Sequence, residues 1–353
     1  MHKHLRKISL WWEKQLDDTE FVILITSLLV IFSLLHFMGY ILAPLFIAIA
    51  LAYVLEGVIG ILEKLHLPRW AATSIVGISI IWFFLFSLLL IIPLLAEQIA
   101  HLIKQTPDFI KNIQITLDKI QNYASWLTPE YLQQAIADNA QKLQEWAGQL
   151  VSLSLTSIPA ILTLSIYIIL VPVLVFFLLK DKHVLLTWSQ RFTPKENTLI
   201  KKVWGELDTQ IGNYIRGKFW ETFVVGLVTW FSFWLLDHPY ALLLGAITGI
   251  SVWIPFVGAA LVTIPVVLLS FYQWGLTDIT LYALIAYFVI QILDGNLLVP
   301  LLFSGMVNLH PIAIVVAILF FGSIWGIVGV FIAIPMAALV QSVLNVRREN
   351  TAI

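Results

Sequence analysis

The stretch Gln291–Pro311 holds the residues of this chain whose types and spacing are best suited to chemistry. It lies between two strongly apolar runs, yet it carries five polar side chains that could contact a solute or an ion: Gln291, Asp294, Asn296, Asn308 and His310. A carboxylate at the edge of a membrane-embedded run costs about 2.5–3.5 kcal/mol on insertion scales, so its presence indicates a function. Aspartate and histidine can both change charge, which suits proton coupling. We therefore predict that this stretch lines a pathway for a solute or an ion.

The same stretch contains residues that disturb a helix. Glycine weakens a helix and proline removes a backbone hydrogen bond, so we do not expect an apolar helix to continue undisturbed here. In hydrocarbon the freed backbone groups need protein or water as partners, and broken helices therefore tend to line cavities. A second interruption, SVWIPFVG, lies at Ser251–Gly258. The residues expected to break or turn the helices are Pro255, Gly258, Gly295, Pro300, Gly305 and Pro311.

Each of these features also has a structural explanation. The Ser251–Gly258 interruption is either a break within one crossing or the turn of a hairpin made of two short half-helices. Asp294 could lie at a helix end in water, and His310 could lie at the membrane interface. Glu221, just inside an apolar run, could form an interfacial ion pair with Arg216. The sequence alone leaves these alternatives open.

The composition indicates an all-α polytopic membrane protein. The 353 residues are 60% hydrophobic and 12% charged, with a mean hydropathy of +0.92. A soluble domain averages about 45–50% apolar and about 25% charged residues. The net charge of −1 and the lack of a basic stripe argue against a nucleic-acid partner. Because the chain has no cysteine, disulfides, thiolate metal sites and cysteine nucleophiles are excluded.

Apolar runs of membrane-spanning character predict about eight transmembrane helices, with broken or re-entrant helices in the C-terminal half. The runs are Phe21–Met38, Tyr40–Leu55, Trp70–Leu95, Ile158–Leu179, Phe219–Leu236, Ala241–Leu269, Leu276–Leu293 and Ile312–Val340. The polar leader Met1–Glu20 has no signal-peptidase-like cleavage site after it, so we interpret the first run as an uncleaved span.

Three regions follow from these runs. Residues 1–96 form the leader and three spans, and residues 97–150 form a helical segment outside the membrane. Residues 151–353 form a C-terminal transmembrane domain that includes an amphipathic cytoplasmic helix at about residues 181–218. The leader, the Lys180–Lys218 segment and the tail are rich in Lys and Arg, which places them in the cytoplasm. We therefore expect both termini inside the cell (inner) membrane and the 97–150 segment outside.

Enzyme signatures are absent from the sequence. It contains no H-E-x-x-H, no Walker A motif and no complete G-x-S-x-G, and its histidines are scattered. We therefore expect no enzyme activity, no metal and no cofactor.

Four segments carry a resemblance to a known family. FFLLKD (Phe176–Asp181), ELDTQIGNYIRGK (Glu206–Lys218), HPYALLLGAITGISVWIPFVGA (His238–Ala259) and the long motif Gln291–Leu339 resemble the autoinducer-2 exporter family, the PerM-like permeases. The resemblance covers residues 20–342. It implies about eight spans with re-entrant character in the second half, a long segment outside the membrane between spans three and four, and homo-oligomers. It also implies export of the signal autoinducer-2 or, in some members, sodium/proton antiport.

The chain departs from the family at the residue of greatest interest. Members often have Glu where this chain has Asp294, and a more polar residue where it has Gly295. We therefore predict a secondary-type permease or exporter of a small, autoinducer-2-like solute that has no ATPase of its own. One alternative is a Na⁺/proton antiporter in which Asp294 alternates between protonated and ion-bound forms. A further alternative is an oligomeric channel or membrane scaffold. The expected partners are a small solute or ion, the lipid bilayer and further copies of the chain.

Overall fold

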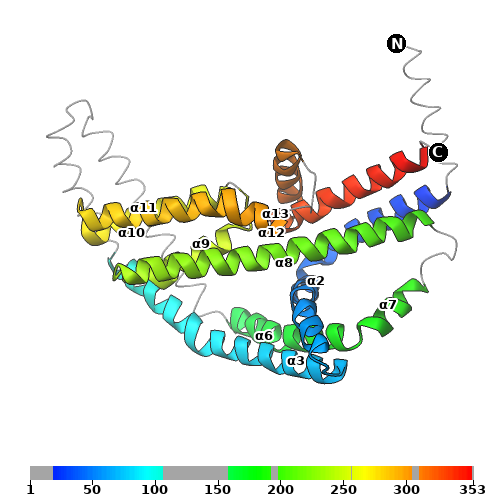
Figure 1. The fold of residues 1–353 in the computed structure, drawn as a ribbon, viewed down its shortest axis with the longest axis horizontal. Helices are drawn as coiled ribbons and strands as arrows, with labels where there is room; N and C mark the ends of the chain where they lie inside the picture. The colour runs from blue at the N-terminus through cyan, green and yellow to red at the C-terminus, as the bar shows by residue number, and fades with distance from the viewer. Residues whose placement is uncertain (1–18, 106–157, 192–197, 256, 304–309, 352–353) are drawn as a thin grey trace, which may run out of the picture. The chain divides into compact units, whose positions relative to one another are not determined.

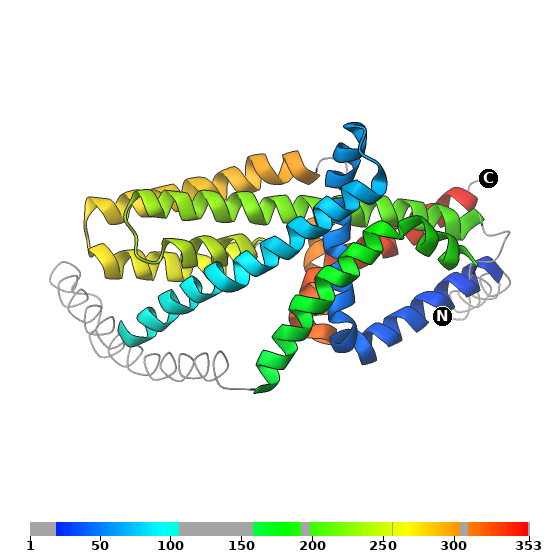
Figure 2. The same ribbon diagram turned by 90° about the horizontal axis from the view of Figure 1, so that it is seen from below.

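The computed structural model describes residues 19–105, 158–191, 198–255, 257–303 and 310–351. Every element assigned within these ranges is helical, which confirms the all-α prediction. The bounds are α2 Thr19–Lys64, α3 Arg69–Phe86, η1 Ser87–Ile91, α6 Ile158–Lys180, α7 Lys182–Gln190, α8 Thr198–Leu235, α9 Ala241–Ser251, α10 Val257–Trp274, α11 Asp278–Leu293, η2 Asp294–Leu298, α12 Val299–Phe303 and α13 Pro311–Thr351. Figures 1 and 2 show these helices from two directions. Most of the expected extramembrane segment, residues 106–150, lies outside the described residues.

The protein is an integral membrane protein. Four helical stretches are long and apolar enough to cross a bilayer: Ile41–Lys64, Arg69–Gln105, Val257–Trp274 and Asp278–Phe303. Large apolar side chains are exposed along the helices, including Leu89 at 72% and Ile169 at 68%. Such exposure is stable where lipid, rather than water, surrounds the helices.

Helix α2 is a single helix of 46 residues that continues through Gly39, the expected joint between the first two apolar runs. The helix therefore does not stop at the expected joint, and its part Ile41–Lys64 is by itself long and apolar enough to cross a bilayer. Neither Gly39 nor Pro44 ends the helix, because a backbone surrounded by hydrocarbon finds no hydrogen-bond partners outside the helix itself. Helix α8 is likewise continuous, and it joins the predicted amphipathic segment directly to the predicted span Phe219–Leu236.

The chain forms two compact units. The first unit contains Met1–Gly77, Leu170–Gly217 and Phe303–Ile353, and the second contains Ile78–Ile169 and Lys218–Leu302. Within the second unit, the C-terminal half of α8 lies beside α9, α10 and α11 in both views (Figures 1 and 2).

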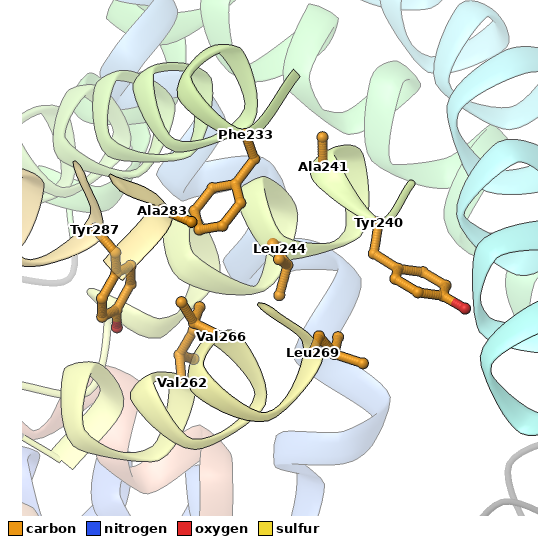
Figure 3. Close-up of a cluster of buried hydrophobic side chains, with 9 residues drawn as sticks. All are labelled: Phe233, Tyr240, Ala241, Leu244, Val262, Val266, Leu269, Ala283 and Tyr287. Atoms are coloured by element: carbon orange, nitrogen blue, oxygen red, sulfur yellow. The ribbon is translucent and has the colours of Figure 1, made fainter. Parts of the chain in front are cut away.

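The core of the second unit is an apolar cluster contributed by α8, the turn after it, α9, α10 and α11 (Figure 3). Its members are Phe233, Tyr240, Ala241, Leu244, Val262, Val266, Leu269, Ala283 and Tyr287. Glycines bring α8 and α9 unusually close. A Cβ on Gly245 would lie 2.8 Å from the carbonyl oxygen of Gly226, and a Cβ on Gly249 would lie 2.7 Å from that of Thr222. Small residues therefore set the helix spacing, as they do in many membrane proteins.

The Ser251–Gly258 interruption is the turn of a hairpin. Helix α9 ends at Ser251 and α10 begins at Val257, so Pro255 lies in the connection and Gly258 in the first turn of α10. The two helices pack against each other through the core of the unit. A Cβ on Gly258 would overlap the Ser251 carbonyl oxygen, so only glycine fits there. Of the two alternatives, the structure selects the hairpin.

The helix is disturbed at Gly295 and Pro300, as expected, but it widens into a π-helical turn instead of stopping. Helices α11, η2 and α12 form one helical stretch from Asp278 to Phe303, and η2 is a π-helical turn in which Val299 donates its N–H to the Asp294 carbonyl. The π register ends directly before Pro300, which has no N–H to donate. In an apolar setting this shift keeps more backbone groups bonded than a break would. Gly305 lies outside the described residues.

Helix α13 folds back on itself. Pro311 opens it, where a proline costs no helical hydrogen bond. Gly326 has φ 59° and ψ −137°, which divides the element into the apolar arms Ile312–Gly326 and Gly329–Val343. Ala317, Phe321 and Ala333 form the core between the arms, with Ile318, Trp325, Met336 and Ala337 packed around it. The first unit therefore contains a helix hairpin of its own.

Candidate functional site

A buried ion pair lies on α8 in the second unit. Lys218 and Glu221 are three residues apart, so their side chains share one face of the helix. The Lys218 Nζ atom lies 2.7 Å from Oε2 of Glu221. Lys218 is 6% exposed and Glu221 is 2% exposed. Charges are rarely buried this far in an apolar helix bundle without a function.

Lys218 also binds the hairpin turn. Its Nζ donates a hydrogen bond of 2.7 Å to the carbonyl oxygen of Val252, the residue that follows α9. The last carbonyls of a helix lack helical partners, and a lysine can satisfy one of them. Val252 belongs to an apolar cluster with Val225, Ile290, Trp253 and Leu298. The ion pair therefore has a largely apolar setting and anchors the turn between α9 and α10 to α8.

Asp294 and Gln291 complete the site from α11 and η2. The Oδ1 atom of Asp294 and the Nε2 atom of Gln291 are buried and have no hydrogen-bond partner in the described part of the chain. The two residues are three apart, on one face of the helix. Asp294 lies within electrostatic reach of both Lys218 and Glu221. The π-helical turn and the hairpin turn, far apart in the sequence, thus meet at one buried cluster of charges.

The cluster has an uncompensated charge and two unused hydrogen-bonding atoms. One ammonium faces two carboxylates, so the three ionised side chains carry a net charge of −1. An unpaired buried polar atom costs about 1–3 kcal/mol relative to a bonded one. A proton, a cation or a polar solute that satisfied these atoms would recover this energy. The arrangement is suited to binding and releasing a small species rather than to covalent chemistry.

Of the other predicted residues, Asn296 and His310 make local contacts. Asn296 is exposed, and its amide donates 2.9 Å to the carbonyl of Ile292, so it bonds within its own helix. His310 is exposed in the first unit and precedes α13, where its carbonyl accepts the N–H of Ala313 at 2.8 Å. Asn308 lies outside the described residues.

Sequence reasoning missed Lys218, and it gave Glu221 the wrong partner. Glu221 pairs with Lys218, whereas Arg216 donates to Oδ1 of Asn213 at 2.7 Å within the first unit. The available signal was the Lys-x-x-Glu spacing at the start of an apolar helix, since such residues meet on one face. Lys218 was instead read as the end of a basic cytoplasmic segment.

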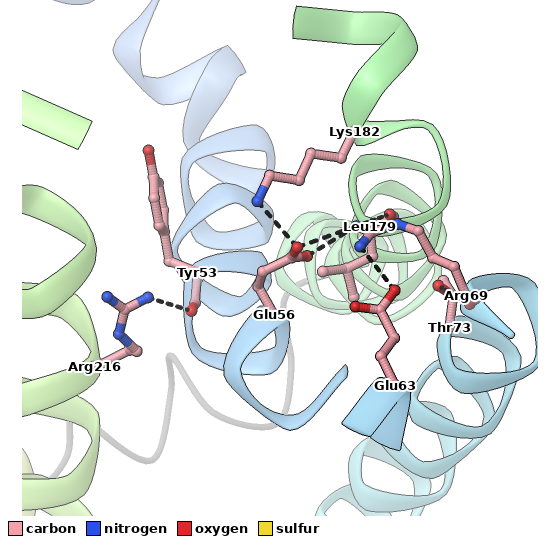
Figure 4. Close-up of polar contacts among 8 residues, drawn as sticks. All are labelled: Tyr53, Glu56, Glu63, Arg69, Thr73, Leu179, Lys182 and Arg216. Atoms are coloured by element: carbon pink, nitrogen blue, oxygen red, sulfur yellow. Dashed lines mark hydrogen bonds and ion pairs between the residues drawn. The ribbon is translucent and has the colours of Figure 1, made fainter. Parts of the chain in front are cut away.

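The first unit contains a second polar network (Figure 4). Glu56 on α2 accepts from Arg69 at 3.1 Å and from Lys182 at 3.0 Å. Arg69 also contacts Glu63 at 3.2 Å and donates to the Leu179 carbonyl at 3.1 Å. These side chains are 25–42% exposed, in contrast to those of the Lys218 cluster. The network joins the ends of α2, α3, α6 and α7, and we interpret it as structural.

A third polar group lies at the start of α9 in the second unit. Gln98 accepts the N–H of Leu243 at 2.9 Å, and Gln105 accepts from the Tyr240 hydroxyl at 2.9 Å. His238, in the turn before α9 and outside the spanning helices, is buried against the Trp274 ring, with 4.9 Å between ring centroids. Burial lowers the pKa of His238 to about 4, so this imidazole is neutral at pH 7.

Comparison with known proteins agrees with this membrane architecture. The family model described as AI-2E family transporter matches residues 23–349. PerM of Escherichia coli K12, named as a permease, is 38% identical over 349 residues and 97% of each chain. YueF of Bacillus subtilis 168, named as a transport protein, is 30% identical over 86% of this chain and 84% of its own. TqsA of Escherichia coli K12, named AI-2 transport protein, is 23% identical over 94% and 93%. The chain therefore belongs to the AI-2E family of transporters.

Proposed function

We propose that this protein is a secondary transporter that exports a small polar solute of the autoinducer-2 type and has no ATPase of its own. Membership of the family supports transport, and the name of TqsA supports the solute class. The observation that carries the proposal is the Asp294 carboxylate, which has a buried, unpartnered oxygen beside the buried pair Lys218–Glu221. From the basic segments of the sequence, we place both termini in the cytoplasm, at the cell (inner) membrane.

The solute binds where the two unused atoms lie. A hydroxyl of the solute donates to Oδ1 of Asp294, and an oxygen of the solute accepts from Nε2 of Gln291. Lys218 holds the hairpin turn through Val252 while Glu221 neutralises its charge. The pair is buried, and Val252 beside it belongs to an apolar cluster, so little water reaches the site and each polar contact with the solute is strengthened.

A cation/proton antiporter is the second candidate, and the charge balance of the cluster favours it. Two carboxylates share one ammonium, which leaves one negative charge for a proton or a cation. In this version Asp294 alternates between a protonated and an ion-bound form, and only one of the two species is bound at a time. Such competition for one carboxylate is sufficient to couple the two fluxes.

Transport by purified protein in liposomes tests both candidates. Autoinducer-2, sodium and protons are offered with and without an imposed pH or sodium gradient. Accumulation of solute against its gradient, only when an ion gradient is imposed, supports the exporter. Sodium flux that drives protons in the opposite direction supports the antiporter. Flux that runs only downhill indicates a channel, and absence of flux together with a bound partner protein indicates a scaffold.

Two matched variants test whether Asp294 is the group that binds the solute or ion. Asp294→Asn removes the buried charge, and Asp278→Asn removes an exposed carboxylate from the start of the same helix. We expect coupled transport to be lost in the first variant and kept in the second. Unchanged transport and unchanged pH dependence in Asp294→Asn would show that this carboxylate is not the binding group.

A further inference from the structure

The end of the helical stretch Arg69–Gln105 carries polar side chains that contact α9 and α10 within the second unit. His101 and Gln105 are four residues apart, so they share one face of this helix. Nδ1 of His101 lies 3.1 Å from the Tyr240 hydroxyl oxygen, and Nε2 of His101 lies 3.2 Å from Nε2 of Gln105. The hydroxyls of Tyr240 and Tyr272 both donate to Oε1 of Gln105, at 2.9 Å and 3.2 Å. Figure 3 shows the Tyr240 ring pointing towards this helix.

The hydrogen bonds among His101, Tyr240 and Gln105 form a closed cycle in which each side chain donates to the next. The Tyr240 hydroxyl has one hydrogen, which it donates to Gln105, so its oxygen accepts from His101. Nδ1 of His101 therefore carries the proton, and Nε2 accepts from the Gln105 amide. The cycle exists only for a neutral imidazole, because a protonated one donates from both nitrogens.

A second proton on the His101 imidazole breaks this cycle. Its Nε2 then carries an N–H that faces the amide NH₂ of Gln105, and two donors cannot bond to each other. To accept from the charged imidazole, Gln105 must turn its oxygen towards Nε2. That movement takes the oxygen away from the hydroxyls of Tyr240 and Tyr272. The two bonds that Gln105 makes to the chain before α9 and to α10 are therefore lost together.

We propose that His101 is a proton-binding site and that its protonation releases α9 and α10 from the end of the Arg69–Gln105 helix. The cycle of His101, Tyr240 and Gln105 is here called the His101 latch. Histidine is the side-chain type that ordinarily exchanges protons between about pH 5 and 8. His101 is exposed, so water can deliver the proton to it.

The titratable groups that face His101 come from three elements. The Tyr240 hydroxyl, just before α9, contacts His101 directly, and the Tyr272 hydroxyl of α10 shares its acceptor. On its own helix, Glu97 lies four residues before His101 and Lys104 three residues after it, and both are exposed. Tyrosine has an ordinary pKa of about 10, and a carboxylate and an ammonium of opposite charge offset each other. The histidine is therefore the group in the latch that a change near neutral pH acts on.

Helix α9 connects the His101 latch to the buried charges. Tyr240 directly precedes this helix, and Val252, which directly follows it, accepts from Nζ of Lys218 at 2.7 Å. In the first turn of α9, the N–H of Leu243 donates to Gln98 at 2.9 Å. The helix has 11 residues and is about 16 Å long. Because a helix this short moves as one body, release of its start also frees its end to move relative to Lys218.

The latch identifies the ion that drives export, and this step rests on the proposed function. Residues 97–150 are expected outside the cell, so His101 takes its proton from the outer solution. Protonation releases α9, and the turn beside the Lys218–Glu221 pair moves away from the solute bound at Asp294. The coupling ion of the exporter is then the proton, and an acidic outer solution favours release of the solute.

Cysteine labelling of the purified protein tests the latch and needs no transport. The chain contains no cysteine, so single-cysteine variants need no prior removal. Leu102→Cys places a thiol beneath the latch, because Leu102 packs against the apolar core of the second unit. Ala100→Cys, at an exposed position of the same helix, gives the reference rate at each pH. The measured quantity is the ratio of the two maleimide labelling rates, at pH 8 and at pH 6.

We expect this ratio to rise several-fold from pH 8 to pH 6 in the otherwise unchanged protein. His101→Gln takes up no proton, so its ratio should be the same at both pH values. Gln105→Leu removes the shared acceptor, so its ratio should be high at both. His238→Asn, beside Tyr240, and His183→Gln, in the first unit, should keep the rise.

A ratio that does not change with pH, or that rises equally in His101→Gln, would overturn the proposal. A ratio in Gln105→Leu that equals the unchanged protein's ratio at pH 8 would also overturn it, because the latch would then hold nothing in place. The expected labelling together with absent flux in liposomes would refute the proposed transport function alone. Export that a sodium gradient drives and a proton gradient does not would refute the proton as the coupling ion.

Discussion

Lys218 on α8 donates a hydrogen bond from Nζ to the carbonyl oxygen of Val252, 2.7 Å away, where α9 has just ended. This bond links a helix that carries the buried charge to the turn of a hairpin. We therefore expect a change in the charge that Lys218 faces to shift the position of the hairpin turn. In the proposed transporter, occupation of Asp294 is the event that changes this charge.

Replacement of Lys218 should destabilise the protein strongly. Lys218→Met leaves Glu221 buried without its partner and removes the donor to Val252. Breaking a buried pair in this way costs about 3–5 kcal/mol. We expect a clear drop in the midpoint of thermal unfolding in detergent, followed by tryptophan fluorescence.

A surface pair provides the control for Lys218. Lys182→Met breaks a pair with Glu56 whose lysine is 42% exposed, and exposed pairs contribute only about 0–1 kcal/mol. The double variant Lys218→Met/Glu221→Leu should recover part of the loss, because it leaves no unpaired carboxylate. Equal unfolding midpoints for Lys218→Met and Lys182→Met would contradict the assigned role of the buried pair.

A substitution of Gln291 should weaken transport without lowering the stability of the protein. Its buried Nε2 has no partner in the described residues, so Gln291→Leu removes an unsatisfied donor and should leave stability equal or raise it by up to about 1–3 kcal/mol. Solute transport should nevertheless fall, through a higher KM, because the donor to the solute is lost. The measurements are the unfolding midpoint and the concentration dependence of transport in liposomes.

Asn296 is the matched control for Gln291. It is exposed and bonds to Ile292 on its own helix, so Asn296→Leu should leave the KM unchanged. If Asn296→Leu raised the KM and Gln291→Leu did not, the solute would contact the exposed face of this helix instead.

The sequence was sufficient to predict the fold class and one side of the site. A carboxylate within an apolar run is visible without any structure, so Asp294 and, close to it, Gln291 could be predicted. Glu221 and Lys218 are far from Asp294 in the sequence, and only the packing of α8 on the hairpin turn and α11 brings them near. No local sequence pattern predicts that Asp294 lies near the Lys218–Glu221 pair.

At two places the chain responds to glycine and proline differently from what helix propensity alone predicts, because propensity does not describe the surroundings. In water, Gly295 and Pro300 would favour a break, since water can bond the freed backbone groups. In an apolar helix the freed groups have few other partners, and the chain adopts a π-helical turn at Asp294–Leu298. Gly39 fails to end α2 for the same reason. His310, a predicted pathway residue, accepts the N–H of Ile312 with its ring at the start of α13.

The two hairpin glycines should not tolerate a side chain. Gly258→Ala and Gly329→Ala each place a Cβ against a backbone carbonyl, which cannot rotate away. Overpacking of this kind costs about 1–3 kcal/mol, so both variants should lose thermal stability and transport. The unfolding midpoint and liposome transport are measured on each variant.

Two other glycines provide controls, because an alanine Cβ has open space around it there. Gly60 and Gly295 have no atom within 4 Å of an added Cβ. Alanine there should stabilise the helix by about 0.5–1 kcal/mol, because glycine is the more flexible residue when unfolded. If Gly329→Ala behaved like Gly60→Ala, the close packing of the two arms of α13 would be wrong.

His238 should make the stability of the protein depend on pH. Burial lowers its pKa to about 4 from the ordinary value of about 6.5, so between these values the unfolded chain binds a proton that the folded one does not. The contribution of neutral His238 to the free energy of unfolding is therefore fully present above pH 6.5. It is lost as the pH drops towards 4, by about 3 kcal/mol at most. His238→Asn keeps an acceptor for the Tyr240 N–H but cannot titrate in this range, so its unfolding midpoint should fall less between pH 7.5 and 5.

His183→Asn, which removes an exposed histidine, should keep the pH dependence of the parent protein. Equal pH dependence in the two variants would show that protonation of His238 does not limit stability.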